Sequence, residues 1–176
     1  MRAALYAQRK PERVARLAVS GFVWTGEGSP TLAKRREHLA EYRASNRRPI
    51  NRAFVRSIFT RDRAQTTDER QIEAFTDAVL ALDATVPTGT YVDMCANLPL
   101  VDPLKLKVPT CILRGEYDGI ATLQDVANFV ARLPNGDKQL VVLPGVAHSV
   151  FGAKNRKLGY DALTAYFARA GATSTA

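Results

Sequence analysis

The chain has 176 residues, of which 46% are hydrophobic and 24% are charged, a composition typical of a soluble globular protein with one core. The net charge is +8, but acidic residues are mixed with the basic ones and no nucleic-acid-binding motif accompanies them, so we expect no nucleic-acid partner. No apolar run approaches the roughly 18 residues of a membrane span, so we expect no membrane partner either.

The first thirty residues predict a helix followed by a strand. Residues 2–10 place Ala, Leu and Tyr at helical spacing, and Pro11 follows where a helix tends to stop. Residues 14–23 form an apolar, partly β-branched run, which indicates a strand buried on both faces. Glycines and a proline within residues 26–30 then break the chain.

Residues 31–98 differ in character, because polar stretches with apolar residues at helical spacing replace the apolar runs. Helices are predicted over 31–45 and 50–60, from Asp68 until Pro87 and Gly89 end the helix, and over 90–97. No part of this stretch shows a strand pattern. We therefore expect 31–98 to be an all-helical insertion between two strands of a sheet.

The remaining residues alternate between strands and helices. The predicted elements are a strand at 108–114, a helix at 122–133 capped by Thr122, a strand at 139–143, a helix at 156–170 and a frayed tail at 171–176. Alternation of buried strands with helices indicates the α/β class, with a parallel sheet covered by helices on its faces.

Two polar residues follow neighbouring strands. Asp118 lies between two glycines just after the strand at 108–114, and His148 follows the strand at 139–143, 30 residues further on. The carboxyl ends of parallel strands meet at one edge of a sheet, where chemistry collects. A carboxylate that binds one imidazole nitrogen leaves the other nitrogen free to act as a base. Asp118 and His148 are therefore candidate catalytic residues.

Simpler interpretations of these residues stay open. An Asp followed by Gly is also typical of a simple turn, so Asp118 could be a turn residue. His148 could simply lie at the surface. His38 is surrounded by charged residues and is predicted to be a surface residue. Cys95 and Cys111 form no CxxC pair, so we expect small buried side chains and no disulfide framework.

Three stretches resemble the α/β-hydrolase family in the family's order. VPTCILRGEYDGI at 108–120 resembles its seventh strand and acid loop, and QLVVLPGVAHS at 139–149 its eighth strand and histidine loop. Residues 3–19 are similar to the helix after the nucleophile and the sixth strand. The resemblance implies that Asp118 is the catalytic acid and His148 the catalytic base. Glu27 is an alternative acid, because some relatives place the acid after the sixth strand.

The resemblance also implies a division of the chain. Residues 1–30 and 99–176 would form a partial α/β-hydrolase core of about three parallel strands, and 31–98 would be the lid, or cap, that many members insert there. In that arrangement four aromatic side chains of the lid are expected to shape the substrate pocket. They are Phe54, Phe59, Phe75 and Tyr91.

One part of the family pattern is missing. The nucleophile of the family lies on a G-x-S-x-G turn, and no such motif occurs here. Aligned with the family, Met1 falls just after that turn, so the nucleophile and the oxyanion hole would precede residue 1. Ser20 and Ser29 are poor substitutes because neither lies on a strand-to-helix turn, and Ser149, next to His148, has no recognisable oxyanion donors.

The sequence therefore predicts an N-terminally truncated α/β-hydrolase of the Ser-dependent ester or amide type, unable to run triad chemistry alone. The alternative is a non-catalytic paralogue that acts as a binding or interaction protein. No phosphate-binding motif or metal-ligand spacing occurs, so we expect neither a cofactor nor a metal. We expect a cytoplasmic location, and self-association through the exposed edge of the strand at 16–23.

Overall fold

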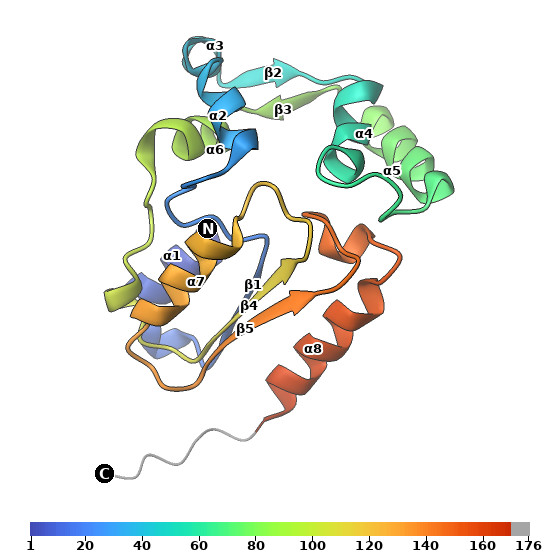
Figure 1. Ribbon diagram of the computed structural model, residues 1–176. Coiled ribbons are helices and arrows are strands. Elements are labelled where there is room, and N and C mark those ends of the chain that lie inside the picture. The colour runs from blue at the N-terminus through green and yellow to red at the C-terminus, as the bar shows by residue number, and fades with distance from the viewer. Residues whose placement is uncertain (170–176) are drawn as a thin grey trace, which may run out of the picture.

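The computed structural model describes residues 1–169 of the chain (Figure 1). In chain order the elements are α1 (Arg2–Arg9), η1 (Pro11–Arg13), β1 (Leu17–Ser20), α2 (Pro30–Arg36), α3 (Leu39–Ala44), β2 (Arg47–Pro49), α4 (Arg52–Thr60), α5 (Glu69–Leu82), β3 (Thr85–Pro87), α6 (Gly89–Val92), the π-helical η2 (Asp93–Asn97), η3 (Pro103–Lys105), β4 (Thr110–Gly115), α7 (Leu123–Arg132), β5 (Lys138–Leu143), η4 (Val150–Gly152) and α8 (Arg156–Ala168).

The three predicted apolar strands form one parallel sheet in the order β1-β4-β5. Val19 lies opposite Ile112 in the first pair, and Leu113 lies opposite Val141 in the second. The predicted α/β class is therefore confirmed. Strand β1 is shorter than the predicted 14–23, because Gly21 adopts a left-handed backbone with φ +57° and ends the extended run.

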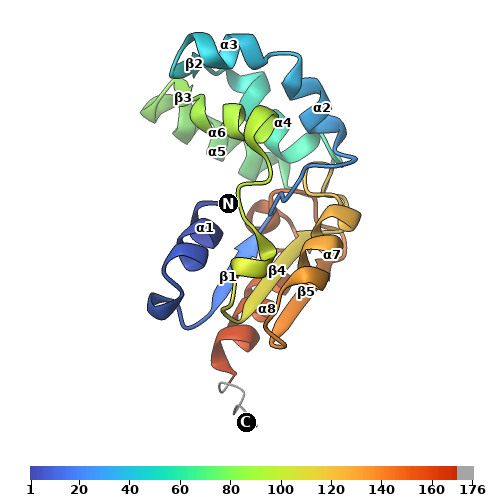
Figure 2. The same cartoon turned by 90° about the vertical axis from the view of Figure 1, so that its left-hand side faces the viewer.

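Helices cover both faces of this sheet (Figures 1 and 2). Side chains alternate along β4, so that Ile112 joins an apolar cluster with α1 and α7, whereas Cys111 and Leu113 join a second cluster with α8. All six residues of β4 are buried, as befits a central strand. Strand β4 therefore packs against both apolar clusters, and this packing fixes the position of its carboxyl end.

The 31–98 segment lies over the carboxyl ends of the strands (Figure 1). Helices dominate it, but β2 and β3 pair in an antiparallel two-stranded sheet, with Arg48 opposite Val86. The expectation of an all-helical segment is wrong for these residues. Strands of three residues are too short to show an alternating pattern, and Pro87, which indicated only a helix end, closes β3.

Other boundaries differ by smaller amounts. The predicted helix at 31–45 is two helices, α2 and α3, which separate at Glu37 and His38. The Thr122 side chain accepts a hydrogen bond from the Asp125 N–H and caps α7 as predicted. Helix α8 ends at Ala168, and the last predicted helical residue, Ala170, lies outside the described residues together with the tail. In the described part of the chain, no helix combines the length and apolarity needed to cross a membrane.

Candidate active site

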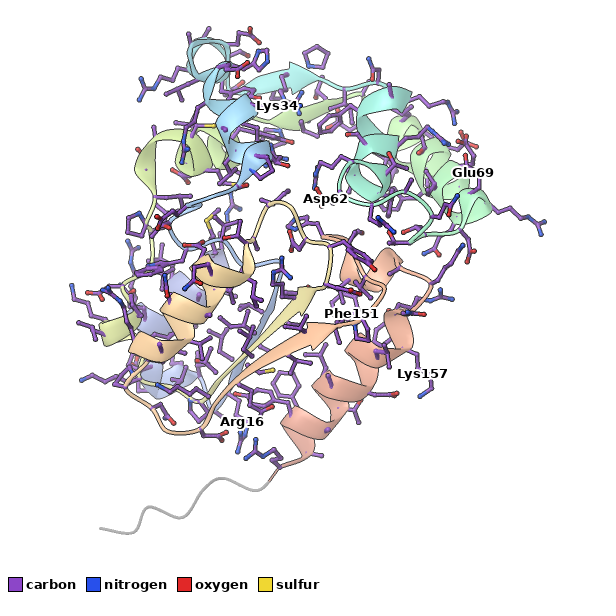
Figure 3. All side chains as sticks on the ribbon, viewed as in Figure 1. Arg16, Lys34, Asp62, Glu69, Phe151 and Lys157 are labelled. Carbon is purple, nitrogen blue, oxygen red and sulfur yellow. The ribbon has the colours of Figure 1, made fainter. Side chains whose placement is uncertain are left out.

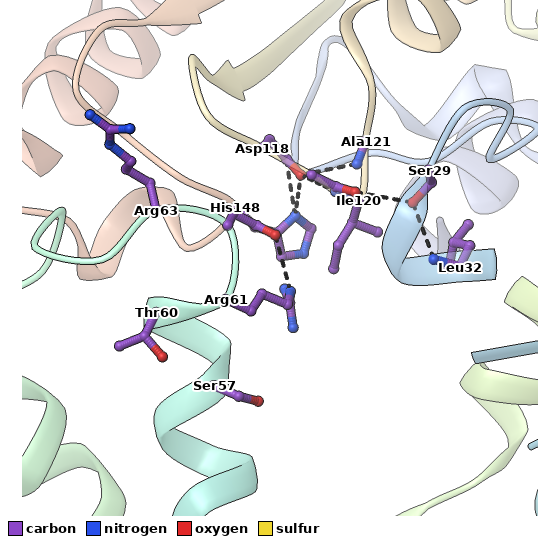
Figure 4. A network of polar contacts seen from close by, with 12 residues as sticks. Ser29, Leu32, Ser57, Thr60, Arg61, Arg63, Asp118, Ile120, Ala121 and His148 are labelled. Atoms are coloured by element: carbon purple, nitrogen blue, oxygen red, sulfur yellow. Dashed lines mark hydrogen bonds and ion pairs between the residues drawn. The ribbon is translucent and has the colours of Figure 1, made fainter. Parts of the chain in front are cut away.

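The loops after β4 and β5 bring Asp118 and His148 together (Figure 4). The Nδ1 atom of His148 lies 2.9 Å from Oδ2 of Asp118 and 3.0 Å from Oδ1. The two side chains come from neighbouring parallel strands whose carboxyl ends share an edge, as the sequence indicates. The structure therefore contains an Asp–His pair with the geometry that orients an imidazole for acid–base chemistry.

The Asp118 carboxylate is almost completely buried, with 3% of its surface exposed. Burial by itself would raise the pKa of Asp118. His148 lowers it through its hydrogen bond and charge, and so do the backbone N–H groups of Ala121 and Ile120, each 2.9 Å from Oδ1. These contacts outweigh burial, and the pKa lies below its ordinary value. An ionised carboxylate only accepts hydrogen bonds, so Nδ1 of His148 carries the proton. The other ring nitrogen, Nε2, is then the basic one.

Arg114 holds the acid loop, the turn after β4 that contains Asp118, in place. Its buried guanidinium donates to four carbonyl oxygens: to Ala121 at 2.8 Å, to Gly115 at 2.7 Å, to Glu116 at 3.1 Å and to Asp118 at 2.9 Å. These bonds use four of the five donors of the guanidinium and tie the turn to the end of β4. The sequence shows Arg114 only as the last residue of an apolar strand, so its role could not be foreseen.

The acid loop and the histidine loop are also tied directly to each other. The Tyr117 N–H donates to the Val146 carbonyl at 2.9 Å, and the Gly145 N–H donates to the Glu116 carboxylate at 2.8 Å. A side chain at Gly115 would place Cβ 2.2 Å from the Ala147 carbonyl oxygen, so only glycine allows this approach. The glycine that ends β4 thus lets the two loops meet.

Gly21, the residue after β1, packs closely against the imidazole of His148. A Cβ atom there would lie 2.8 Å from Cε1 of His148, and the φ of +57° disfavours any other residue. Sequence reasoning placed Gly21 inside a strand and missed this contact. A glycine in an otherwise apolar strand pattern is, however, a recognised signal of close approach.

Asp125 anchors the segment that leads from β1 into residues 31–98. Its carboxylate accepts from the backbone N–H groups of Trp24, Thr25 and Gly26 at 3.0–3.2 Å and from the Thr25 hydroxyl. Asp125 lies in the first turn of α7, directly after the acid loop. The first turn of α7 therefore positions both the acid loop and the entry to the 31–98 segment.

Two cavities lie between the sheet edge and the 31–98 segment, with volumes of about 510 and 590 Å³. His148 lines the larger one, and both share Arg35, Phe54, Arg61 and Tyr91. In Figure 4 the Arg61 guanidinium lies below the His148 ring. The reactive face of the imidazole therefore opens onto a space large enough for a small organic substrate.

The four aromatic residues expected at the pocket divide into two pairs. Phe54 and Tyr91 line both cavities. Phe59 and Phe75 instead stack edge-on with ring centroids 5.2 Å apart, Phe59 buried and Phe75 half-exposed, and neither lines these cavities. Helical periodicity shows that a residue lies on an apolar face but does not show which neighbour that face contacts, which is why the two pairs looked alike.

Among the described residues only Asp118 is hydrogen-bonded to the His148 ring, so no serine or cysteine side chain is bonded to it. The Ser29 hydroxyl donates to the Gly119 carbonyl and accepts from Leu32, so it serves as the cap of α2. Ser20 is exposed at the end of β1. Glu27, the alternative acid, is also exposed and makes no bond to the His148 ring.

The remaining candidates have ordinary structural roles. Cys111 is completely buried, and burial raises the pKa of its thiol to about 11, so the thiolate is disfavoured. His38 is exposed and pairs with Glu41 at 3.0 Å, at the rim of the smaller cavity. Within residues 1–169 no group of three or more His, Cys, Asp or Glu side chains could hold a metal ion.

The parallel sheet, its covering helices and the Asp–His pair at its carboxyl edge are features of an α/β-hydrolase. A sequence profile of the family described as serine aminopeptidase, S33, matches residues 1–155, and the chain belongs to that family. A search of curated protein sequences finds no significant match.

Solved structures of α/β-hydrolases resemble the chain over most of its length. A monoglyceride lipase from Saccharomyces cerevisiae matches with a TM-score of 0.61 at 16% identity, over 93% of this chain and 59% of its own. A monoacylglycerol lipase from Paleococcus ferrophilus matches at 0.62 and 12%, over 92% and 62%. An esterase from Thermogutta terrifontis matches at 0.61 and 18%, over 92% and 58%. The chain therefore spans about three fifths of the length of these proteins.

Proposed function

We propose that the chain provides the acid and base of a Ser-dependent hydrolase that cleaves an ester or amide of a small molecule, and that the nucleophile comes from polypeptide outside these 176 residues. The observation that carries the proposal is the bond between the buried, ionised Asp118 and Nδ1 of His148 beside a substrate-sized cavity. Membership of a serine peptidase family and the likeness to lipases and an esterase support the same reaction class.

In this reaction Nε2 of His148 would take the proton from the nucleophile's hydroxyl and later deliver it to the leaving alcohol or amine. Asp118 would hold the imidazole in the required tautomer and stabilise the imidazolium that forms. The 31–98 segment would act as the lid that covers the substrate, with Phe54 and Tyr91 against its apolar part. No cofactor or metal has a role in these steps, and the reaction needs neither nucleic acid nor membrane.

The test compares two proteins with a chromogenic short-chain ester such as p-nitrophenyl butyrate. One is the chain itself, and the other is the chain joined to an N-terminal extension that carries a G-x-S-x-G turn. We expect no His148-dependent turnover from the chain, and turnover from the extended protein that falls by at least about 1,000-fold in His148→Ala.

Either of two results would contradict the proposal. Turnover by the chain alone that disappears in His148→Ala would place the nucleophile inside these residues. If the extended protein kept its activity in His148→Ala, His148 would not be the base of the reaction. If the extended protein bound ligands in the cavity without turnover, the alternative of a non-catalytic binding protein would be favoured instead.

A further inference from the structure

Four cationic side chains line the smaller cavity beneath the 31–98 segment. Lys34, Arg35, Arg48 and Arg61 contribute to the lining of the smaller cavity, against one carboxylate, Asp62. Asp62 lies 3.4 Å from Nε of Arg61 and so offsets only that guanidinium. Figure 3 shows Asp62 where this segment faces the sheet and Glu69 on its outer side. The interior of the segment therefore carries an excess of positive charge.

Three other arginines of the segment are neutralised by partners on neighbouring elements. Their ion pairs are Arg47–Asp83, Arg52–Glu73, Arg52–Asp77, Arg56–Glu69 and Arg56–Glu73. No such carboxylate partner lies within 4 Å of Arg35 or Arg48 in the described part of the chain. Arg35 and Arg48 therefore differ from these three arginines in lining the cavity without an acid partner. Other arginines of the segment, such as the exposed Arg43, also pair with no acid among the described residues, so the cavity position is what sets Arg35 and Arg48 apart.

Arg35 and Arg48 are held in place by an aromatic ring instead. Their guanidinium carbons lie 5.1 and 4.6 Å from the centroid of Tyr91, and that of Arg48 lies 4.3 Å from the centroid of Phe54. Nε of Arg48 is buried without a hydrogen-bond partner. Burial, together with the nearby charge of Arg61, lowers the pKa of Arg35. Nη1 of Arg35 donates to Sδ of Met94 at 3.6 Å. Two oriented cations, one of which has an unpaired Nε, therefore line one cavity.

We propose that Arg35 and Arg48, with Arg61 at the border of the two cavities, bind an anionic group of the substrate, either a carboxylate or a phosphate. Planar guanidinium forks match both groups, because each offers paired acceptor oxygens. The adjoining cavity, which His148 lines, includes the apolar side chains Ile58, Val86 and Met94. The substrate is accordingly an ester or amide whose reacting bond lies at His148 and whose anionic end lies at the arginines, with an apolar body between them.

This inference deepens the proposed hydrolase function and rests on it only in calling the ligand a substrate. Binding can be measured without turnover, by isothermal titration calorimetry on the chain itself. The probes are 4-phenylbutyrate, its neutral match 4-phenylbutanamide, and phenyl phosphate. We expect the two anions to bind at least about tenfold more tightly than the amide, since a hydrogen bond to a charged group contributes this much. Whichever anion binds more tightly identifies the charged group.

Variants locate the binding site. Arg35→Gln and Arg48→Gln are each expected to weaken anion binding by about tenfold, and to leave the weak binding of the amide unchanged. The matched control is Arg43→Gln, which removes the same charge from the exposed face of α3, outside these cavities. Circular dichroism checks that each variant is folded. If Arg48→Gln does not fold because its aromatic contacts are lost, Arg35→Gln decides the question.

Two results would overturn the inference. One is equal affinity for the amide and the anions, and the other is a loss of affinity in Arg43→Gln that matches the loss in Arg35→Gln. Failure of the ester assay with intact, arginine-dependent anion binding would reject the hydrolase and keep the anion site. Ester hydrolysis by the extended protein, with no preference for anions in binding, would keep the hydrolase and reject the anion site.

Discussion

Asp118 is a buried charge whose partners outweigh the cost of removing it from water. His148 and the backbone N–H groups of Ile120 and Ala121 all donate to its two oxygens. A buried carboxylate is tolerated only when its acceptors are used in this way. The same bonds that orient the imidazole therefore contribute to the stability of the fold.

This arrangement predicts a pH-dependent stability. Because the folded pKa of Asp118 lies below its ordinary value, its ionised form stabilises the fold above the unfolded pKa of about 3.9, and that stability is lost as pH falls through the folded pKa. We expect Asp118→Asn to lower the free energy of unfolding by roughly 1–3 kcal/mol at pH 7. The difference from the natural chain should shrink below about pH 4. Urea unfolding followed from pH 7 to pH 3 measures it; a gap that stayed constant would contradict the assignment.

Gly21 gives a second prediction at the residue scale. Alanine there meets both the His148 ring and an unfavourable backbone conformation, so we expect Gly21→Ala to cost about 1–3 kcal/mol and to displace the imidazole. Gly136→Ala is the matched control, because its Cβ would meet nothing within 4 Å, and it should change stability by less than about 0.5 kcal/mol. Thermal unfolding and the histidine ring signals in NMR spectra report the two effects. Equal behaviour of the two variants would refute the close contact.

At the scale of elements, one arginine at the end of β4 organises the acid loop. We expect Arg114→Met to leave four carbonyl oxygens without their donor and to destabilise the chain by roughly 2–4 kcal/mol. Amide hydrogen exchange should show the loss of protection concentrated in residues 116–121. Arg43→Met, at an exposed position on α3, is the control and should leave these amides protected. Uniform loss of protection along the chain would mean that Arg114 acts only on global stability.

Sequence patterns predicted the central elements well and the insertion less well. β4 and β5 are apolar runs bounded by glycine and proline, and the loops that follow them contain the two residues that meet, Asp118 and His148. β2 and β3 escaped prediction because each has three residues and depends on a partner almost forty positions away. The cavity arginines escaped for a similar reason, because a basic residue on a helix looks the same whether it faces water or Tyr91.

At the scale of the whole molecule, the sheet has an open side. Among the described residues β1 pairs only with β4, so its other edge offers unpaired backbone groups. We predict that the chain associates through this edge. Light scattering coupled to gel filtration should show a mass that rises with concentration, and Ser20→Lys, which adds a charge at the exposed end of β1, should reduce it. A monodisperse monomer at micromolar concentration would be evidence against association.

The Asp118–His148 pair is built within a single βαβ crossover, from β4 through α7 to β5. The bonds from Arg114 to the acid loop and from Ile120 and Ala121 to Asp118 also begin and end in this unit, and the Ser29 hydroxyl adds one bond to the Gly119 carbonyl from outside it. Among the described residues, no hydrogen bond to the His148 ring comes from the 31–98 segment, so the bond that orients the imidazole does not depend on that segment. If that segment opened to admit a ligand, the access of water to Nε2 would change. The hydrogen bond from Nδ1 to Asp118 would remain.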